Sequence, residues 1–249
     1  MRPLLRQLKP TNGIAHSVHS GLLLVLPVAT FLLVRLNFVQ LALSIIVLSK
    51  WRMFAVRPRF WASNVRANAV DLMVGLSIVL FMSNSGSLIM QVVWAALYGV
   101  WLLLIKPASG SGAVAVQAGL GQLAALTALY LTWAGGPILG ITVLSGLFCF
   151  LAARHFLDSF DEPYARMLSY TWGYFGAALA WVLSHWLLFY HSVAQPTLLL
   201  STLGYGLAGL YYLDHNDRLS KGARRQVFII MLVVVLVVLA FSDWGDKVV

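Results

Sequence analysis

Residues 50–66 read Lys-Trp-Arg-Met-Phe-Ala-Val-Arg-Pro-Arg-Phe-Trp-Ala-Ser-Asn-Val-Arg, with five cations and no acid. Apolar runs lie on both sides, so this stretch is predicted to be a short loop between two membrane-spanning helices. Loops this rich in Lys and Arg stay on the cytoplasmic side, because their transfer across the bilayer during insertion is disfavoured. The orientation of every other predicted span follows from this one loop.

The composition indicates that a lipid bilayer surrounds most of the chain. The chain is 60% hydrophobic and 10% charged, whereas soluble domains carry about 25% charged residues. The net charge is +9, but the cations lie in short loops. No basic domain is present to bind nucleic acid, so the charge favours attraction to anionic lipid headgroups. Cys149 is the single cysteine, which excludes a disulfide within the chain.

The hydrophobic pattern predicts the number of membrane spans. A helix that crosses a bilayer needs about 20 mostly apolar residues. Candidate spans cover residues 14–34, 36–49, 68–83, 88–105, 113–133, 137–156, 167–190, 197–213 and 227–241. We therefore predict an all-α, polytopic transmembrane helical bundle of about nine spans. It forms one integral membrane domain over residues 1–249, with a cytoplasmic N-terminus and the C-terminus outside.

The distribution of basic residues supports this count. With residues 50–66 in the cytoplasm, all Lys and Arg residues except Arg35 and Lys247 fall on the cytoplasmic side. The predicted outer loops, such as residues 83–87 and 134–136, are short and uncharged. A wrong count would scatter the cations over both faces. The pattern predicts a multi-pass protein of the plasma (inner) membrane.

The second predicted span is the weakest of the nine. Its fourteen residues, 36–49, would rise only about 21 Å as a helix, against a hydrocarbon core of about 30 Å. In an alternative arrangement the first two segments form a re-entrant hairpin that does not cross. That arrangement has eight spans and moves Arg2, Arg6 and Lys9 to the outside.

Acidic residues gather in two predicted cytoplasmic loops. Each loop carries an Asp-x-x-Asp pair, and on a helix this spacing puts both carboxylates on one face. Together the loops would offer oxygen ligands to Mg²⁺ and arginines to a phosphate group. The candidate cytoplasmic acidic and phosphate site comprises Arg154, His155, Asp158, Asp161, Glu162, Arg166, Asp214, Asp217 and Arg218. The ordinary interpretation is a set of solvated surface ion pairs, each worth about 0–1 kcal/mol, and the short pattern favours it.

Residues 158–166 read Asp-x-x-Asp-Glu-x-x-Ala-Arg, which resembles the opening of the CDP-alcohol phosphatidyltransferase signature, Asp-x-x-Asp-Gly-x-x-Ala-Arg. The resemblance covers these residues alone. The family signature continues with a Gly and two Asp, where this chain has Phe175, Leu179 and Leu183. Two of the four acids that would hold metal and activate the hydroxyl are therefore absent, and we assign the chain to no family on this stretch.

The middle of the predicted membrane region carries few polar residues and no ionisable one. Gln122, Thr127, Thr142 and Ser145 are the polar side chains near the centre. We interpret them as side chains that form hydrogen bonds between helices. As an alternative they form an intramembrane polar pocket, lined also by Gly206, for an apolar or zwitterionic molecule. Because intramembrane charges mark proton relays and ion paths, their absence here argues against a proton-coupled transporter or an ion channel.

These observations lead to one hypothesis and one main alternative. The leading hypothesis is a non-catalytic membrane component without a cofactor, either an assembly or scaffold subunit or a small permease-like protein. The alternative is a Mg²⁺-dependent enzyme acting on a phosphorylated or diphosphate lipid at the cytoplasmic face. The expected partners are the bilayer, other membrane subunits, and anionic lipid headgroups at Lys50, Arg52, Arg57, Arg59 and Arg66.

Overall fold

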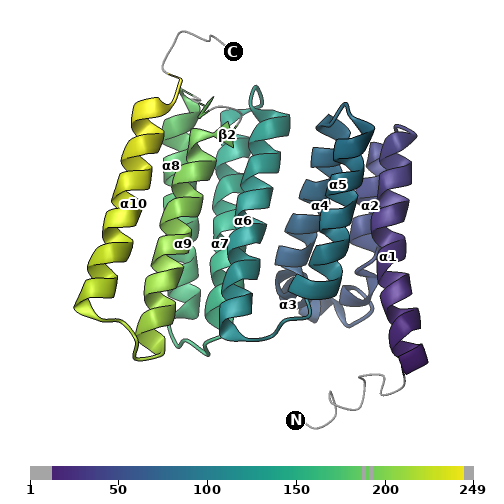
Figure 1. Ribbon diagram of the computed structural model, residues 1–249, viewed down its shortest axis with the longest axis horizontal. Coiled ribbons are helices and arrows are strands. Elements are labelled where there is room, and N and C mark those ends of the chain that lie inside the picture. The colour runs from purple at the N-terminus through teal and green to yellow at the C-terminus, as the bar shows by residue number, and fades with distance from the viewer. Residues whose placement is uncertain (1–12, 187–188, 191–192, 244–249) are drawn as a thin grey trace. The chain divides into compact units, whose positions relative to one another are not determined.

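The computed structural model describes residues 13–186, 189–190 and 193–243. The predicted terminal cations Arg2, Arg6, Lys9 and Lys247 lie outside these residues. The described part is all-α apart from one short hairpin (Figure 1). Its ten α-helices are α1 (Gly13–Arg35), α2 (Val39–Leu48), α3 (Trp61–Ala67), α4 (Ala69–Asn84), α5 (Leu88–Val100), α6 (Ser111–Trp133), α7 (Ile138–Asp158), α8 (Ala165–Ser184), α9 (Gln195–His215) and α10 (Lys221–Phe241).

Short elements join some of these helices. Two 3₁₀ turns, η2 (Trp51–Met53) and η3 (Pro58–Phe60), precede α3, and the π-helical turn η4 (Trp101–Ile105) extends α5. Strands β1 (Phe189–Tyr190) and β2 (Val193–Ala194) pair antiparallel between α8 and α9.

Each predicted span contains a helix, but some boundaries differ. Helix α8, in the seventh predicted span, ends at Ser184 rather than residue 190, because the β1–β2 hairpin follows. The second helix has 10 residues. Its late start follows from Asn37, whose φ of 62° ends α1 in the left-handed region, and asparagine tolerates that region better than most residues. The basic stretch predicted as a loop also contains α3.

Length and hydropathy make some of these helices candidate membrane spans. Among the described residues, four helical segments are long and apolar enough to cross a bilayer: Leu88–Ile105, Ser111–Trp133, Ile138–Asp158 and Lys221–Phe241. A fifth is added if Pro58–Ala67 and Ala69–Asn84, which meet at a 64° bend, count as one span. The chain is therefore a candidate multi-pass membrane protein. The finer prediction of nine spans stays a prediction.

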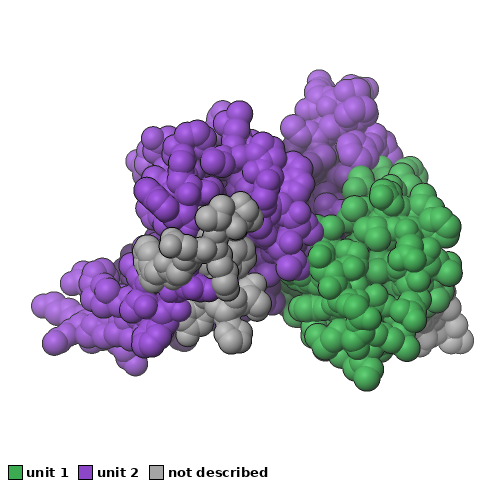
Figure 2. Space-filling model, turned by 90° about the horizontal axis from the view of Figure 1, so that it is seen from above, with its two compact units in different colours: residues 1–51, 78–107 green, residues 52–77, 108–249 purple. Residues whose placement is uncertain are grey.

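The chain divides into two compact units (Figure 2). Unit 1 comprises residues 1–51 and 78–107, and unit 2 comprises residues 52–77 and 108–249. In unit 1, α1 packs against α2 and α5. In unit 2, α6 packs against α7 and α9, α8 against α7, and α10 against α9.

Small residues set the close approach of α7 and α8 in unit 2. A Cβ at Gly146 would lie 2.8 Å from the Cβ of Ala177, and a Cβ at Gly173 would lie 2.9 Å from the Cβ of Phe150. The sulfur of Cys149 would lie 2.6 Å from a Cβ at Gly176. Without side chains at these glycines the helices make backbone-level contact, which is the usual mode of helix association in membranes.

Helix α10 is attached to α9 along a narrow seam. The sulfur of Met231 occupies the space where a Cβ at Gly206 would lie, and the amide of Gln195 donates to the hydroxyl of Ser242 at 3.2 Å. Within α10, Met231 and Val238 are buried, whereas most of its other apolar side chains are exposed. A helix this apolar and this exposed is suited to hydrocarbon rather than to water.

Candidate functional site

The structure brings the two predicted acidic loops into contact. Phe160, in the turn after α7, packs edge-on against Tyr211 and His215 near the end of α9, with ring centroids 5.2 Å and 4.9 Å apart. The hydroxyl of Tyr211 donates to the carboxylate of Glu162. The loops therefore meet through aromatic rings and Glu162. Tyr211 is not predictable from the sequence alone, because no local pattern indicates which side chain will face a distant loop.

Glu162 is held as an anion by these contacts. The hydrogen bond from Tyr211 lowers the pKa of its carboxyl below the ordinary value, and the backbone N–H of Tyr164 and the nearby His215 act in the same direction. The N–H of Tyr164 lies 3.2 Å from the carboxylate. A carboxylate that accepts two hydrogen bonds is stabilised in its charged form.

Neither Asp-x-x-Asp pair lies wholly within a helix, so the spacing does not place both carboxylates on one helix face. Asp158 is the last residue of α7 and Asp214 lies in α9, but Asp161 and Asp217 lie beyond the helix ends. Both have left-handed backbones, with φ of 52° and 54°. All four aspartates are exposed. In the described part of the chain, no three His, Cys, Asp or Glu side chains are close enough together to hold a metal ion.

Asp217 has a structural role at the end of α9. The N–H of Arg218 bonds to the carbonyl of Leu213 at 2.8 Å, and the N–H of Asp217 bonds to the carbonyl of Asp214 at 3.0 Å. Together with the positive φ of Asp217, these bonds form the helix-ending motif in which glycine is the usual residue. The position of this aspartate in the sequence is therefore explained by helix termination.

Arg154 has one ion-pair partner and two buried N–H groups without an acceptor among the described residues. Its Nη2 lies 2.9 Å from Asp158, one turn further along α7, and its side chain is 18% exposed. Its Nε and Nη1 are buried and have no hydrogen-bond acceptor among the described residues. A buried donor without an acceptor costs about 1–3 kcal/mol. Arg166, which is exposed, holds its guanidinium over the ring of Tyr170, 5.9 Å from the centroid.

His155 belongs to a separate contact between α6 and α7. Its Nε2 lies 3.1 Å from the side-chain oxygen of Gln117, with the imidazole N–H as donor. The side-chain nitrogen of Gln117 donates in turn to the carbonyl of Ala108 at 2.8 Å. This chain of bonds fixes the loop before α6 against α7.

Arg218, the remaining cation of the candidate site, is exposed at the end of α9.

Among the four predicted intramembrane polar residues, Gln122 makes the longest-range contacts. Its amide nitrogen donates to the carbonyl of Leu200 at 3.0 Å, and its amide oxygen accepts from the indole N–H of Trp172 at 3.0 Å. Gln122 is buried, and it joins α6 to α8 and α9. A Cβ at Gly204 would lie 3.0 Å from the Trp172 ring and 3.1 Å from the Gln122 amide, so this glycine makes room for the junction.

The other three residues have different surroundings. Ser145 is buried, with its hydroxyl 3.3 Å from that of Tyr130. Thr127 donates to the carbonyl of Leu123 in its own helix at 2.7 Å. The hydroxyl of Thr142 is buried without a partner among the described residues. Gln122 and Ser145 thus bond to different groups, and Thr127 bonds locally.

The basic stretch contains a folded turn in unit 2. The indole N–H of Trp61 donates to the carbonyls of Phe54 and Val56, at 3.1 Å and 3.0 Å. The guanidinium of Arg59 lies over the ring of Phe60, 4.6 Å from the centroid. Phe54 and Trp61 pack edge to face, 5.6 Å apart. Exposed aromatic rings beside arginines suit a membrane interface.

The predicted lipid-contacting cations of this stretch differ in exposure. Arg52, Arg57 and Arg59 are exposed, and Arg66 is half-buried in α3. Lys50 belongs to unit 1 and makes an interaction of its own.

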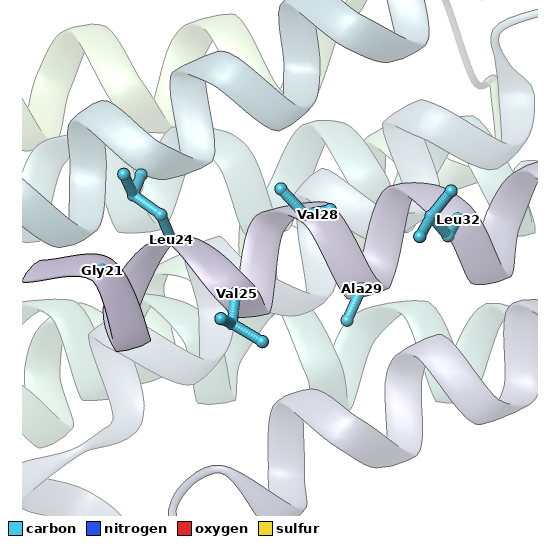
Figure 3. A pocket seen from close by; sticks show the side chains of 6 residues that line it. All are labelled: Gly21, Leu24, Val25, Val28, Ala29 and Leu32. Carbon is cyan, nitrogen blue, oxygen red and sulfur yellow. The ribbon is translucent and has the colours of Figure 1, made fainter. Parts of the chain in front are cut away.

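Unit 1 carries an apolar groove along α1 (Figure 3). Its volume is about 350 Å³, and it is lined by Gly21, Leu24, Val25, Val28, Ala29 and Leu32. Leu24 also reaches α5, where it would lie 3.3 Å from a Cβ at Gly99. The lining side chains are all apolar, so the groove suits hydrocarbon and offers no group to orient a polar ligand.

Comparison of the chain with protein-family models, curated proteins and solved structures finds no match. We therefore infer the function from the residues and contacts described above.

Proposed function

We propose that this chain is a multi-pass integral membrane protein that acts as a non-catalytic membrane component. It would serve as an assembly or scaffold subunit or as a small permease-like protein. In this proposal the two units form one integral membrane domain of nine spans in the inner membrane. The N-terminus is cytoplasmic and the C-terminus lies outside.

The observation that carries the proposal is the use of Gln122. Its two side-chain bonds go to Trp172 and to the backbone of α9, so the polar group nearest the middle of α6 is engaged in holding helices together. Polar side chains that bond across helices are a known means of membrane helix association. The exposed apolar surface of α10 supports a surrounding bilayer.

The orientation is supported by the charges of the described residues. Arg52, Arg57, Arg59 and Arg66 lie in one connection, and Arg218, Lys221, Arg224 and Arg225 lie at another. An excess of Lys and Arg in short connections is characteristic of the cytoplasmic side. The exposed arginines and aromatic rings around Trp61 would rest there on anionic lipid headgroups.

A reporter fused to either end of the full chain tests the orientation. Alkaline phosphatase, which is active only outside the cytoplasm, should be active at the C-terminus and inactive at the N-terminus. A green fluorescent protein fusion should give the opposite pattern. Phosphatase activity at the N-terminus would favour the eight-span arrangement, and inactivity at the C-terminus would contradict the proposed orientation.

One observation favours the enzyme as a second candidate function. The loops that carry Asp158 and Asp214 are linked through Phe160 and Tyr211, as a shared lipid-phosphate site would require. Under this alternative, purified protein converts a phosphorylated lipid only when Mg²⁺ is present, and Asp158→Asn or Asp214→Asn abolishes turnover. Phosphorus NMR of lipid micelles with and without Mg²⁺ measures this turnover. Absence of turnover with both phosphatidate and polyprenyl diphosphate would leave the non-catalytic proposal.

A further inference from the structure

The antiparallel pair α7 and α8 brings two arginines to the same level. Phe150 stacks on Tyr170, with ring centroids 4.9 Å apart. Arg154 lies one helical turn after Phe150, and Arg166 lies one turn before Tyr170. Residues four apart share a helix face, so both arginines lie on the flank marked by this aromatic stack, at the end where α7 leads into α8.

These two cations have few acceptors between them. Asp158 pairs with Nη2 of Arg154 at 2.9 Å. Nε and Nη1 of Arg154 have no acceptor among the described residues, and the guanidinium of Arg166 lies over the ring of Tyr170. An anion with several oxygens, such as a phosphate, is the group that satisfies two guanidinium ions at once.

The same flank becomes apolar toward the middle of the helices. On α7, Leu147 and Val143 lie two and three turns before Arg154 and are 43% and 58% exposed. On α8, Tyr174 lies two turns after Arg166 and is 78% exposed. A charged end that continues into an exposed apolar surface matches a molecule with a phosphate head and hydrocarbon chains.

We propose that this flank binds a membrane phospholipid, with Arg154 and Arg166 holding the phosphate and the acyl chains lying along Val143, Leu147 and Tyr174. The inference rests on the proposed membrane-spanning function and adds a specific lipid partner. Because Nε and Nη1 of Arg154 are buried, binding in this proposal requires its side chain to turn outward to the phosphate oxygens, whereas Arg166 on α8 is already exposed. The apolar surface selects a lipid rather than a soluble phosphate.

Native mass spectrometry of the full chain in detergent micelles tests the proposal. Dioleoyl phosphatidate should remain bound, whereas dioleoylglycerol, which has the same chains without phosphate, should not. Arg154→Gln and Arg166→Gln should each weaken phosphatidate binding about tenfold, because each removes charge-assisted hydrogen bonds. Arg224→Gln, at an exposed arginine of α10, should leave binding unchanged. Arg154→Lys keeps the charge but loses the planar guanidinium with its paired N–H donors, so this variant should bind phosphatidate with intermediate affinity.

Two results would overturn the inference. Equal phosphatidate binding by Arg166→Gln, Arg224→Gln and the unmodified chain would place the headgroup elsewhere, and Arg166 is exposed enough that its replacement should not disturb folding. Complete competition by an equal concentration of inorganic phosphate would indicate a site for a soluble anion. Both measurements are made in micelles, so they are independent of the reporter experiment on orientation.

Discussion

Gln122 links three helices through one amide group. Its nitrogen bonds to α9 and its oxygen accepts from Trp172 of α8. Thr127, one of the other polar residues predicted near the centre, bonds within its own helix. Gln122 therefore connects neighbouring helices, whereas Thr127, five residues later, does not. Replacing each of them should change the stability of the protein by different amounts.

We expect Gln122→Leu to lower the free energy of unfolding by about 1–3 kcal/mol, because two hydrogen-bonding groups lose their partner. Thr127→Val should change it by less than about 0.5 kcal/mol, as is usual for substitutions away from such contacts. A thiol-reactive dye can follow thermal unfolding, since Cys149 is the single cysteine and is buried. Equal melting temperatures for the two variants would show that the Gln122 bonds do not hold the helices.

Glu162 gives the protein a defined acid sensitivity. Its pKa is lowered in the folded protein, mainly by the hydrogen bond from Tyr211. A lowered pKa stabilises the fold above the ordinary carboxyl value of about 4.3, and the contribution is lost as the pH falls through the lowered pKa. Stability should therefore fall in that acidic range. Glu162→Gln and Tyr211→Phe should each flatten this dependence when unfolding is measured between pH 3 and pH 7, and an unchanged profile in both would contradict this role.

At the scale of secondary structure elements, the packing of α7 on α8 depends on residues without side chains. Gly173 faces Phe150, whereas Gly209 in α9 has nothing within 4 Å of the position of a Cβ. Both glycines are helical, so alanine at either site gains the same intrinsic helix propensity of about 1 kcal/mol. The surroundings decide the sign of the net effect.

Gly173→Ala should destabilise the protein by about 1–3 kcal/mol, because the added methyl group forces α7 and α8 apart. Gly209→Ala should stabilise it by up to about 1 kcal/mol. The dye assay on Cys149 is well placed for this comparison, since that residue lies in the same helix interface next to Gly176. A higher melting temperature for Gly173→Ala would contradict the close packing described above.

The end of α9 provides a second test at this scale. Asp217 adopts a positive φ of 54°, which costs a residue with a side chain roughly 1 kcal/mol relative to glycine. Asp217→Gly should therefore raise the thermal unfolding midpoint slightly, and Asp217→Ala should lower it. If Asp217 instead held a metal ion, both variants would lose any stabilisation by added Mg²⁺, which the same unfolding experiment with and without the ion measures.

At the scale of the whole molecule, the proposed topology assigns each connection to one side. Ser87 and Ser109 flank the segment Leu88–Ile105, are both exposed, and lie in connections predicted to be on opposite sides. With Cys149 replaced by Ser, a membrane-impermeant maleimide added to intact cells should label Ser87→Cys and leave Ser109→Cys unlabelled until the membrane is permeabilised. Labelling of both before permeabilisation would show that this segment does not cross.

The sequence predicted the all-α class and the approximate position of each long helix. Apolar runs of about 20 residues are a local property, and backbone groups in hydrocarbon must form helical hydrogen bonds. Finer boundaries were harder to predict. The early end of α8 depends on a hairpin pairing Phe189 with Ala194, and α3 formed within a stretch predicted as a loop.

The candidate site stays a prediction, and the structure shows only where its residues lie. The sequence indicated that two loops, predicted to be cytoplasmic, carry acids and arginines, and the structure brings these loops together. The contacts are made by Glu162 and Tyr211 instead of the four aspartates. Asp161 and Asp217 illustrate the reason, since their spacing would give a shared face only on a helix and each lies where the helix has ended.

By itself, the sequence determined that this protein is a set of apolar helices with its charges at their ends, because transfer into a bilayer is decided segment by segment. Only the tertiary structure decided which polar groups meet. Whether Arg154 lies level with Arg166, and whether Glu162 reaches Tyr211, depends on how closely neighbouring helices approach and on their register. That register is set by contacts such as Gly146 against Gly173, between residues far apart in the chain.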